Sequence, residues 1–335
     1  LLYKDQGNYS KADPIFKRIL DINKNNLSPN HPYQRKSFYN LASNYVDQNL
    51  INNAEKYLLK GLEIEFFLIQ REAPFLTISE RESFISSMGP NYNLAFSFAE
   101  KNDEGRKIAL FTRLNRQGLL EEIEKNQYRL SQLPGPQKLL ARELKEATQK
   151  LSQVNINNDQ YQALRTETEI LEKKLYAILP ELKPRLVSID EITQIIPKNG
   201  VLIEFQKYRP NKKLSFNFKK QENRYLCLIL KPTGEINYFD LGPAEVIESQ
   251  IKKAILATEE GLSDASDLWN SVSNYIIRPL EKVIKEYEIL FISPDAELNR
   301  IPFNALNTKE KNILLSDQYQ IRLLTTGREL LKISE

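Results

Sequence analysis

The chain has 335 residues, which is enough for two or three domains with hydrophobic cores of their own and excludes a small, disulfide-dependent fold. The 47 lysines and arginines nearly balance the 44 aspartates and glutamates, and the net charge of +3 argues against nucleic acid or an anionic membrane as the main partner. With one cysteine and one histidine, neither an intrachain disulfide nor an all-Cys/His zinc site can form, so we expect no bound metal.

Membrane insertion and cofactor binding are also disfavoured. No stretch approaches about 18 consecutive apolar residues and the mean hydropathy is −0.48, so we expect a water-soluble, cytoplasmic chain. The eleven glycines form neither of the phosphate-binding patterns G-x-x-x-x-G-K-[ST] and G-x-G-x-x-G, so we expect no nucleotide or other cofactor. Because the sequence begins inside a predicted helix and stops just after the start of another, we expect it to be part of a longer protein.

An internal repeat occupies the N-terminal region. Residues 1–24 align with 43–66 at the offset of 42 that separates Tyr3 from Tyr45. Four further identical pairs support the alignment: Gln6 with Gln48, Ala12 with Ala54, Leu20 with Leu62 and Ile22 with Ile64. Each copy predicts a helix, a tight turn and a second helix. One such unit cannot bury its apolar face alone, so we expect the units to stack, with a third, weaker helical pair in residues 91–120.

The first helix of the second copy offers a candidate binding surface. Phe38, Leu41, Ala42 and Tyr45 fall at i, i+3, i+4 and i+7 and predict an apolar stripe that faces the partner helix. The opposite side carries five side chains: Lys36, Tyr39, Asn40, Ser43 and Asp47. In stacked repeats such helices line a concave groove, so we predict that these five contact a protein or peptide partner. Plain solvated surface is the alternative.

These features resemble tetratricopeptide repeats, in the 42-residue form found in kinesin light chains and many bacterial arrays. Ser28-Pro29-Asn30-His31-Pro32 occupies the position of the Gly-Pro-Asp-His-Pro turn between repeats of that subfamily. The resemblance covers roughly the first 70 residues and implies a region for protein–protein interaction.

Long helices are predicted next. Residues 103–179 are rich in Glu, Lys, Gln, Arg and Leu and are interrupted at Pro134-Gly135-Pro136. Apolar positions then follow a heptad spacing in two runs, which are Leu140, Leu144, Ala147, Leu151 and Val154, and Tyr161, Leu164, Thr168, Leu171, Leu175 and Ile178. Both runs predict coiled-coil-like seams between helices packed as antiparallel hairpins.

After Pro180 and Pro184 the pattern changes to alternating strands and helices. Strands are predicted over 201–208, 224–231, 236–240, 288–293 and 319–324, and helices over 243–258 and 265–285 with a break at Arg278-Pro279. This alternation predicts an α/β layout. Lys212, Lys213, Lys219 and Lys220 concentrate charge on the tip between the first two strands, where they protect an edge or contact an acidic partner.

Motifs in the last third resemble the CHAT domain, a caspase-like peptidase module that is often joined to tetratricopeptide repeats. The motifs are Ile289-Leu290-Phe291-Ile292-Ser293-Pro294-Asp295, Ile301-Pro302-Phe303-Asn304-Ala305-Leu306 and Leu324-Thr325-Thr326-Gly327-Arg328-Glu329-Leu330-Leu331. The resemblance covers about 185–331 and implies a catalytic histidine and cysteine beyond the Thr-Thr-Gly-Arg motif. Ala296 stands where the family usually has glycine, which predicts a less strained turn. Asp295 we interpret as a turn residue rather than a catalytic one, and residues 302–306 as an apolar plug rather than a docking motif.

Neither histidine nor cysteine of this chain suits catalysis. His31 lies in a repeat turn, and Cys227 lies in the apolar run Leu226-Cys227-Leu228-Ile229-Leu230, where it is expected to be buried. We therefore predict no catalytic residue and no peptidase activity in these 335 residues.

The predicted fold is α plus α/β in three domains. They are a tetratricopeptide-like repeat region at 1–100, a helical-hairpin connector at 101–184 and the N-terminal part of a CHAT domain at 185–335. The resemblance implies a cysteine endopeptidase regulated by a partner of the repeats. The alternative is a non-enzymatic scaffold with a degenerate CHAT domain, and a stand-alone fragment with an exposed sheet edge is a third, weaker possibility.

Overall fold

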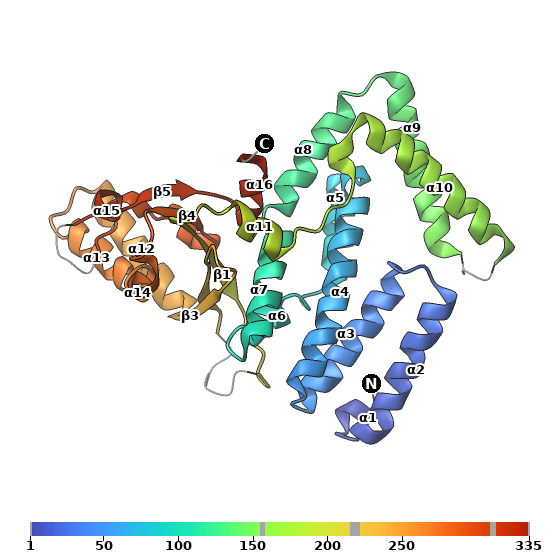
Figure 1. Cartoon of the computed structure of the whole chain (residues 1–335), viewed down its shortest axis with the longest axis horizontal. Helices are drawn as coiled ribbons and strands as arrows, with labels where there is room; N and C mark the ends of the chain where they lie inside the picture. Colours follow the sequence, from blue (N-terminus) through green and yellow to red (C-terminus); the bar gives the residue numbers. More distant parts are fainter. Residues whose placement is uncertain (1, 155–157, 215–221, 309–312, 334–335) are drawn as a thin grey trace. The chain divides into compact units, whose positions relative to one another are not determined.

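The computed structural model describes residues 2–154, 158–214, 222–308 and 313–333 (Figure 1). The chain forms two compact units. Residues Leu1–Tyr92 and Gly118–Leu186 make up the first, here called the helical unit, and residues Asn93–Gln117 and Val187–Glu335 make up the second, the α/β unit. Lys219 and Lys220 of the predicted strand tip lie outside the described residues.

The helical unit begins with the two predicted repeats. Its elements are α1 (Leu2–Asp5), α2 (Tyr9–Asn26), α3 (Pro32–Asp47), α4 (Ile51–Glu72), η1 (Ala73–Phe75), α5 (Ile78–Met88), α8 (Leu119–Ser131), α9 (Gly135–Gln153), α10 (Asp159–Ile178) and η2 (Pro180–Leu182). Both repeats turn through a left-handed residue at the equivalent position, Gly7 with φ of 72° and Asn49 with φ of 57°. Tyr57 of α4 stacks on Phe38 and Tyr45 of α3, so the predicted apolar stripe faces its partner helix.

The two heptad runs form the hairpin of α9 and α10. Leu144 and Ala147 of α9 pack with Leu171 and Leu175 of α10 in one buried cluster, which confirms the predicted packing of these helices. Ile178 at the end of the second run is 42% exposed and lies outside this seam.

The α/β unit is built on a five-stranded sheet with the order β3-β2-β1-β4-β5. Its elements are α6 (Asn93–Phe98), α7 (Asp103–Arg116), α11 (Ile189–Ile195), β1 (Gly200–Tyr208), β2 (Arg224–Leu230), β3 (Ile236–Pro243), α12 (Ala244–Glu259), α13 (Ala265–Ile276), α14 (Glu281–Ile284), β4 (Ile289–Ser293), η3 (Ala296–Arg300), η4 (Phe303–Ala305), α15 (Leu315–Gln318), β5 (Gln320–Leu323), η5 (Gly327–Glu329) and α16 (Leu330–Ile333). β2 pairs antiparallel with β1 and β3, whereas β4 pairs parallel with β1 and β5. The five predicted strands and the predicted helix break before Pro279 are confirmed.

Helices cover both faces of this sheet (Figure 1). Val201, Ile203 and Phe205 of β1 point into a core that α12 and α13 complete on one face. Leu202 and Glu204, which alternate with them, are also fully buried, and α7 contacts β1 and β3 on that side. The sheet is therefore the middle of three layers, and its strands β1 and β2 are buried on both faces.

Residues 93–117 assemble differently from the predicted domain boundaries. The expected third helical pair is present as α6 and α7, which contact each other, but both belong to the α/β unit. The predicted boundary at 100/101 would separate α6 from α7, and the boundary at 184/185 would separate α7 from the sheet on which it packs. The three-domain division itself stays a prediction.

Candidate functional site

The carboxyl ends of the parallel strands define the candidate site of the α/β unit. β1, β4 and β5 run in the same direction, and β1 is the strand at which the order of the sheet reverses. In open α/β sheets, ligands bind outside the carboxyl ends of the strands at such a reversal. Two of the sequence motifs reach this edge, Ser293-Pro294-Asp295 at the end of β4 and Thr325-Thr326-Gly327 after β5.

A fully buried arginine of α7 lies at this edge. The Nε of Arg113 donates to Oε2 of Glu204 on β1 at 2.9 Å, and neither side chain has any solvent exposure. The other guanidinium nitrogens reach several acceptors: Gln206 Oε1 at 3.4 Å, Ser293 O at 3.4 Å, Ser293 Oγ at 3.0 Å, Pro294 O at 2.9 Å and Asp295 Oδ1 at 3.5 Å. The planar fork of donors suits this arrangement because it reaches acceptors on two strands at once.

Glu204 connects the same network to the loop after β5. Its Oε1 accepts a hydrogen bond from the Gly327 N–H at 2.6 Å and one from Thr326 Oγ1 at 3.4 Å. Ser293 Oγ in turn donates to Thr325 O at 2.9 Å. A Cβ on Gly327 would lie 2.3 Å from Leu202 Cδ2, so only glycine allows this close approach.

Asp295 begins the turn after β4, and its side chain accepts hydrogen bonds from β1. Its Oδ2 accepts from the Lys207 N–H at 2.7 Å and from Gln206 Nε2 at 2.9 Å. The expectation of a less strained turn at Ala296 is wrong, because Ala296 has φ of 49° and adopts the left-handed conformation that glycine tolerates better.

An open cavity of about 870 Å³ lies beside this edge. Side chains from the end of β1, the start of β2, α12 and η3 line it, among them Lys207, Arg209, Glu248, Lys252 and Glu297. Glu248 is held in place because it accepts from Lys207 Nζ at 2.6 Å and from the Tyr225 hydroxyl at 2.8 Å. The cavity lining carries charges of both signs.

The lone cysteine and histidine belong to different units. Cys227 on β2 has no solvent exposure, and burial, with a smaller contribution from the Glu204 carboxylate, raises the pKa of its thiol well above the usual range. His31 caps α3, where its Nδ1 accepts from the Tyr33 N–H at 3.1 Å. A thiol with a raised pKa is a poor nucleophile, so Cys227 is a core residue.

Four of the five predicted groove residues lie at least partly exposed on α3. Lys36 is exposed and Asn40 is half-buried. Ser43 and Asp47 are held by Lys4, whose Nζ is 2.7 Å from Ser43 Oγ and 3.2 Å from Asp47 Oδ2.

The prediction that Tyr39 lies on the solvent-facing side of α3 is wrong. Tyr39 is 6% exposed, and its hydroxyl donates to Glu65 Oε2 at 2.8 Å. Gly61 on α4 leaves the space that its ring fills. Sequence periodicity missed this because α3 is buried on two sides.

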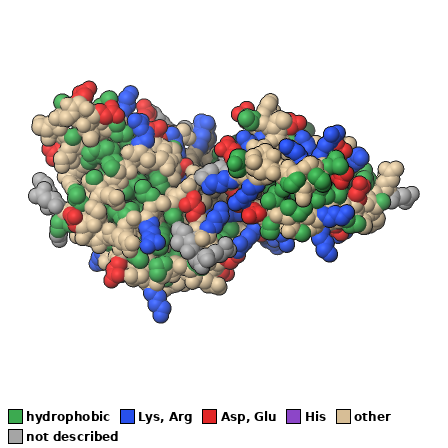
Figure 2. All heavy atoms as spheres, turned by 90° about the horizontal axis from the view of Figure 1, so that it is seen from above, with side chains coloured by type: hydrophobic (Ala, Val, Ile, Leu, Met, Phe, Trp, Pro, Cys, Tyr) green, Lys and Arg blue, Asp and Glu red, His purple; other side chains and the backbone are tan. Residues whose placement is uncertain are grey.

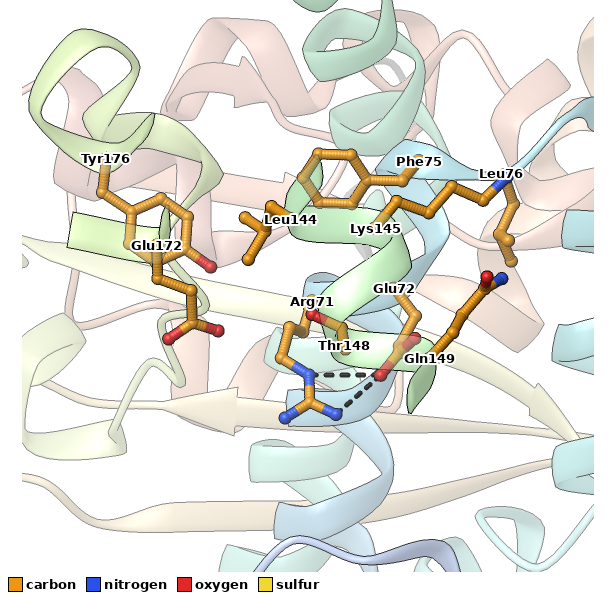
Figure 3. A pocket seen from close by; sticks show the side chains of 10 residues that line it. All are labelled: Arg71, Glu72, Phe75, Leu76, Leu144, Lys145, Thr148, Gln149, Glu172 and Tyr176. Carbon is orange, nitrogen blue, oxygen red and sulfur yellow. Dashed lines mark hydrogen bonds and ion pairs between the residues drawn. The ribbon is translucent and has the colours of Figure 1, made fainter. Parts of the chain in front are cut away.

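The helical unit contains a small cavity of about 20 Å³ between α4, α9 and α10. Figure 3 shows Glu172 and Tyr176 of α10 at this cavity, with Arg71 bonded to Glu72 on α4. The Tyr176 hydroxyl is buried without a hydrogen-bond partner among the described residues. Burial raises the pKa of Glu172, against a smaller opposing effect of the Arg71 charge. The cavity has room for about one water molecule.

Metal and membrane sites were searched over the described part of the chain. These residues contain no group of three or more His, Cys, Asp or Glu side chains arranged to hold a metal ion. None of the helices they form combines the length and apolarity that crossing a bilayer requires. Lys, Arg, Asp and Glu side chains are interspersed over the face shown in Figure 2.

Sequence reasoning missed Arg113 and Glu204. Arg113 lies in a helix whose composition resembles the neighbouring connector helices. Glu204 left a clearer signal, since it is one acidic residue inside the apolar run Val201-Leu202-Ile203-Glu204-Phe205. A charge at such a position requires a buried partner.

The chain belongs to the class of proteins that combine paired helical repeats with a three-layer α/β unit. Comparison with family models gives the particular families. The tetratricopeptide repeat model matches residues 1–26 and 36–66, which covers α1 and α2 and most of α3 and α4. The CHAT domain model matches residues 267–335. The chain therefore has a TPR–CHAT architecture. No curated protein and no solved structure matches it.

Proposed function

We propose that this chain is part of a partner-regulated, caspase-like cysteine endopeptidase, in which the repeats bind a polypeptide and the α/β unit carries the peptidase fold. One observation supports the proposal most directly, the occurrence of tetratricopeptide repeats and a CHAT domain in one chain. The parallel-strand edge with its adjacent cavity of about 870 Å³ supplies a place for a peptide substrate.

The chemistry of such a peptidase needs a thiolate next to an imidazole. Cys227 is buried on β2 and His31 is a helix cap of the helical unit, so neither can serve. We therefore expect these 335 residues to cleave no peptide. Peptide cleavage by this chain that is lost in Cys227→Ala would contradict this expectation.

The activity test first reads the coding sequence past Glu335. Any polypeptide encoded there is expressed together with this chain and treated with a thiol-directed active-site probe. We expect a new cysteine to be labelled, and the labelling to be lost when a new histidine is changed. If no cysteine reacts, the non-enzymatic scaffold is the better description, and partner capture by the repeats becomes its only activity.

The binding test uses the exposed part of α3. Lys36, which is exposed, and Asn40, which is half-buried, are one helical turn apart, whereas Ser43 and Asp47 are engaged by Lys4. We expect Lys36→Ala with Asn40→Ala to abolish binding of an authentic partner peptide. The matched control is Asn52→Ala with Lys56→Ala, an exposed pair at the same spacing on α4. Equal affinity of the two double variants would exclude the groove.

Regulation adds a thermodynamic condition. A partner activates the α/β unit only if it binds the active arrangement more tightly than the inactive one. The scaffold alternative carries no such condition. Measuring partner affinity with and without a probe bound in the peptidase site therefore separates the two functions, since coupling requires the two affinities to differ.

A further inference from the structure

Arg113 of α7 bonds to Glu204 on β1 and to the residues at the end of β4. α7 packs on the sheet face that carries Glu204, and the guanidinium extends beyond β1 to the residues that follow β4. Both charged side chains have no solvent exposure. Removing either partner of such a pair leaves an uncompensated buried charge, so the pair acts as a unit.

The loop after β4 depends directly on this guanidinium. The Ser293 hydroxyl and the Ser293 and Pro294 carbonyls all accept hydrogen bonds from Nη2. Ser293 is the last residue of β4, in register with Glu204 of β1, and Pro294 is the first residue beyond the strand. Arg113 supplies hydrogen-bond donors to both carbonyls at this strand end.

The loop after β5 depends on it indirectly. Arg113 fixes Oε2 of Glu204, and Oε1 of the same carboxylate accepts from the Gly327 N–H. The two oxygens belong to one planar group, so the Arg113 contact at Oε2 sets the direction in which Oε1 meets the Gly327 N–H. One guanidinium thus determines the position of two loops that are far apart in sequence.

We propose that Arg113, acting through Glu204, is a positioning residue of the site at the parallel-strand ends, and that α7 is consequently part of that site. The inference rests on the proposed function where it takes this edge as the place where a peptide binds. It assigns no catalytic role to Arg113, because no substrate can reach a side chain that is fully buried.

The test is amide hydrogen exchange on the full 335-residue chain, which requires no catalysis. In Arg113→Met we expect exchange to accelerate about a hundred-fold in residues 295–298 and 325–330, in line with the loss of a buried ion pair. Arg113→Lys keeps the charge and part of the hydrogen bonding, so we expect about a ten-fold acceleration confined to the same two segments. Lys107→Met, an exposed lysine of the same helix, is the control and should not change exchange.

Thiol accessibility of Cys227 distinguishes loop displacement from unfolding. Cys227 is the single cysteine and is fully buried in the core of the same unit, so a thiol reagent reports opening of the sheet. In Arg113→Lys we expect Cys227 to stay protected while both loops exchange faster. If Arg113→Met unfolds the unit, the proposal is tested with Arg113→Lys alone.

Two results would overturn the proposal. One is exchange of both loops in Arg113→Lys at the rate of the Lys107→Met control. The other is an acceleration spread evenly over the unit, which would make Arg113 a general stability residue. Neither result depends on whether a peptidase is present, so failure of this inference and failure of the proposed function are separate outcomes.

Discussion

Gly327 combines two constraints at one position. Its N–H donates to Glu204 at 2.6 Å, and its Cα lies so close to Leu202 that an added Cβ would meet Leu202 Cδ2 at 2.3 Å. We expect Gly327→Ala to destabilise the α/β unit by about 1–3 kcal/mol, the usual cost of overpacking. Urea unfolding followed by the fluorescence of Trp269, the single tryptophan and part of this unit, measures the effect. Gly135→Ala, where nothing lies within 4 Å, is the control, and equal midpoints for both variants would contradict the prediction.

Glu172 gives the helical unit a predicted pH dependence. Burial raises its pKa in the folded state, so folding favours the protonated form and stability falls as pH rises from the unfolded value through the folded one. Glu172→Gln should therefore stabilise the helical unit at pH 7 by less than about 1 kcal/mol, since solvent screens part of the effect, and give no gain near pH 4.

Thermal unfolding followed by far-ultraviolet circular dichroism at both pH values tests this prediction. Glu143→Gln, an exposed residue of α9, is the control. A gain of the same size at both pH values would show that an effect independent of charge, rather than burial of the ionised Glu172 side chain, stabilises the variant.

At the scale of elements, the close approach of α3 and α4 depends on one small residue. A Cβ on Gly61 would lie 2.5 Å from Tyr39 Cε1, so the Tyr39 ring occupies the space of the missing side chain. Tyr39 is also fixed by its hydrogen bond to Glu65, which Arg35 pairs at 2.9 Å. The ring therefore cannot move away without breaking a buried polar network.

We accordingly expect Gly61→Ala to destabilise the helical unit by about 1–3 kcal/mol, although alanine favours helix formation. Circular dichroism during thermal unfolding measures the change, with Gly135→Ala as the helix control that lacks nearby atoms. A stabilising effect of Gly61→Ala would show that helix propensity outweighs packing at this contact.

For the whole molecule, the interleaved chain path has a consequence for folding. The chain enters the α/β unit at Asn93, leaves it at Gln117 and returns at Val187. Residues 187–335 alone would therefore expose one face of the sheet and would leave Glu204 without its ion-pair partner Arg113. We expect this segment to lack a cooperative unfolding transition by Trp269 fluorescence.

Adding residues 93–117, fused through a flexible linker, should restore cooperative unfolding. The control fusion carries Arg113→Met and should restore it less well. Cooperative unfolding of residues 187–335 without the added helices would contradict the assignment of α6 and α7 to this unit.

Local patterns determined many elements of this protein. The 42-residue repeat, the helix-turn-helix units, the heptad hairpin, the five strands and the break before Pro279 are all visible in the sequence, because periodicity and proline act over a few residues. The burial of Cys227 followed in the same way from its apolar run. The family motifs identified the repeats and the CHAT region that the family models match, although the CHAT model begins at residue 267 and leaves the expected residues 185–266 unmatched.

Only the tertiary structure decided which elements pack together. Arg113 and Glu204 are 91 residues apart, and no local pattern records a contact over that separation. The burial of Tyr39 likewise depends on Gly61 of a neighbouring helix rather than on the periodicity of α3. The sequence by itself thus determined the elements and the families. Tertiary packing placed α7 on the sheet, because the buried charges of Arg113 and Glu204 are stable only when they lie next to each other.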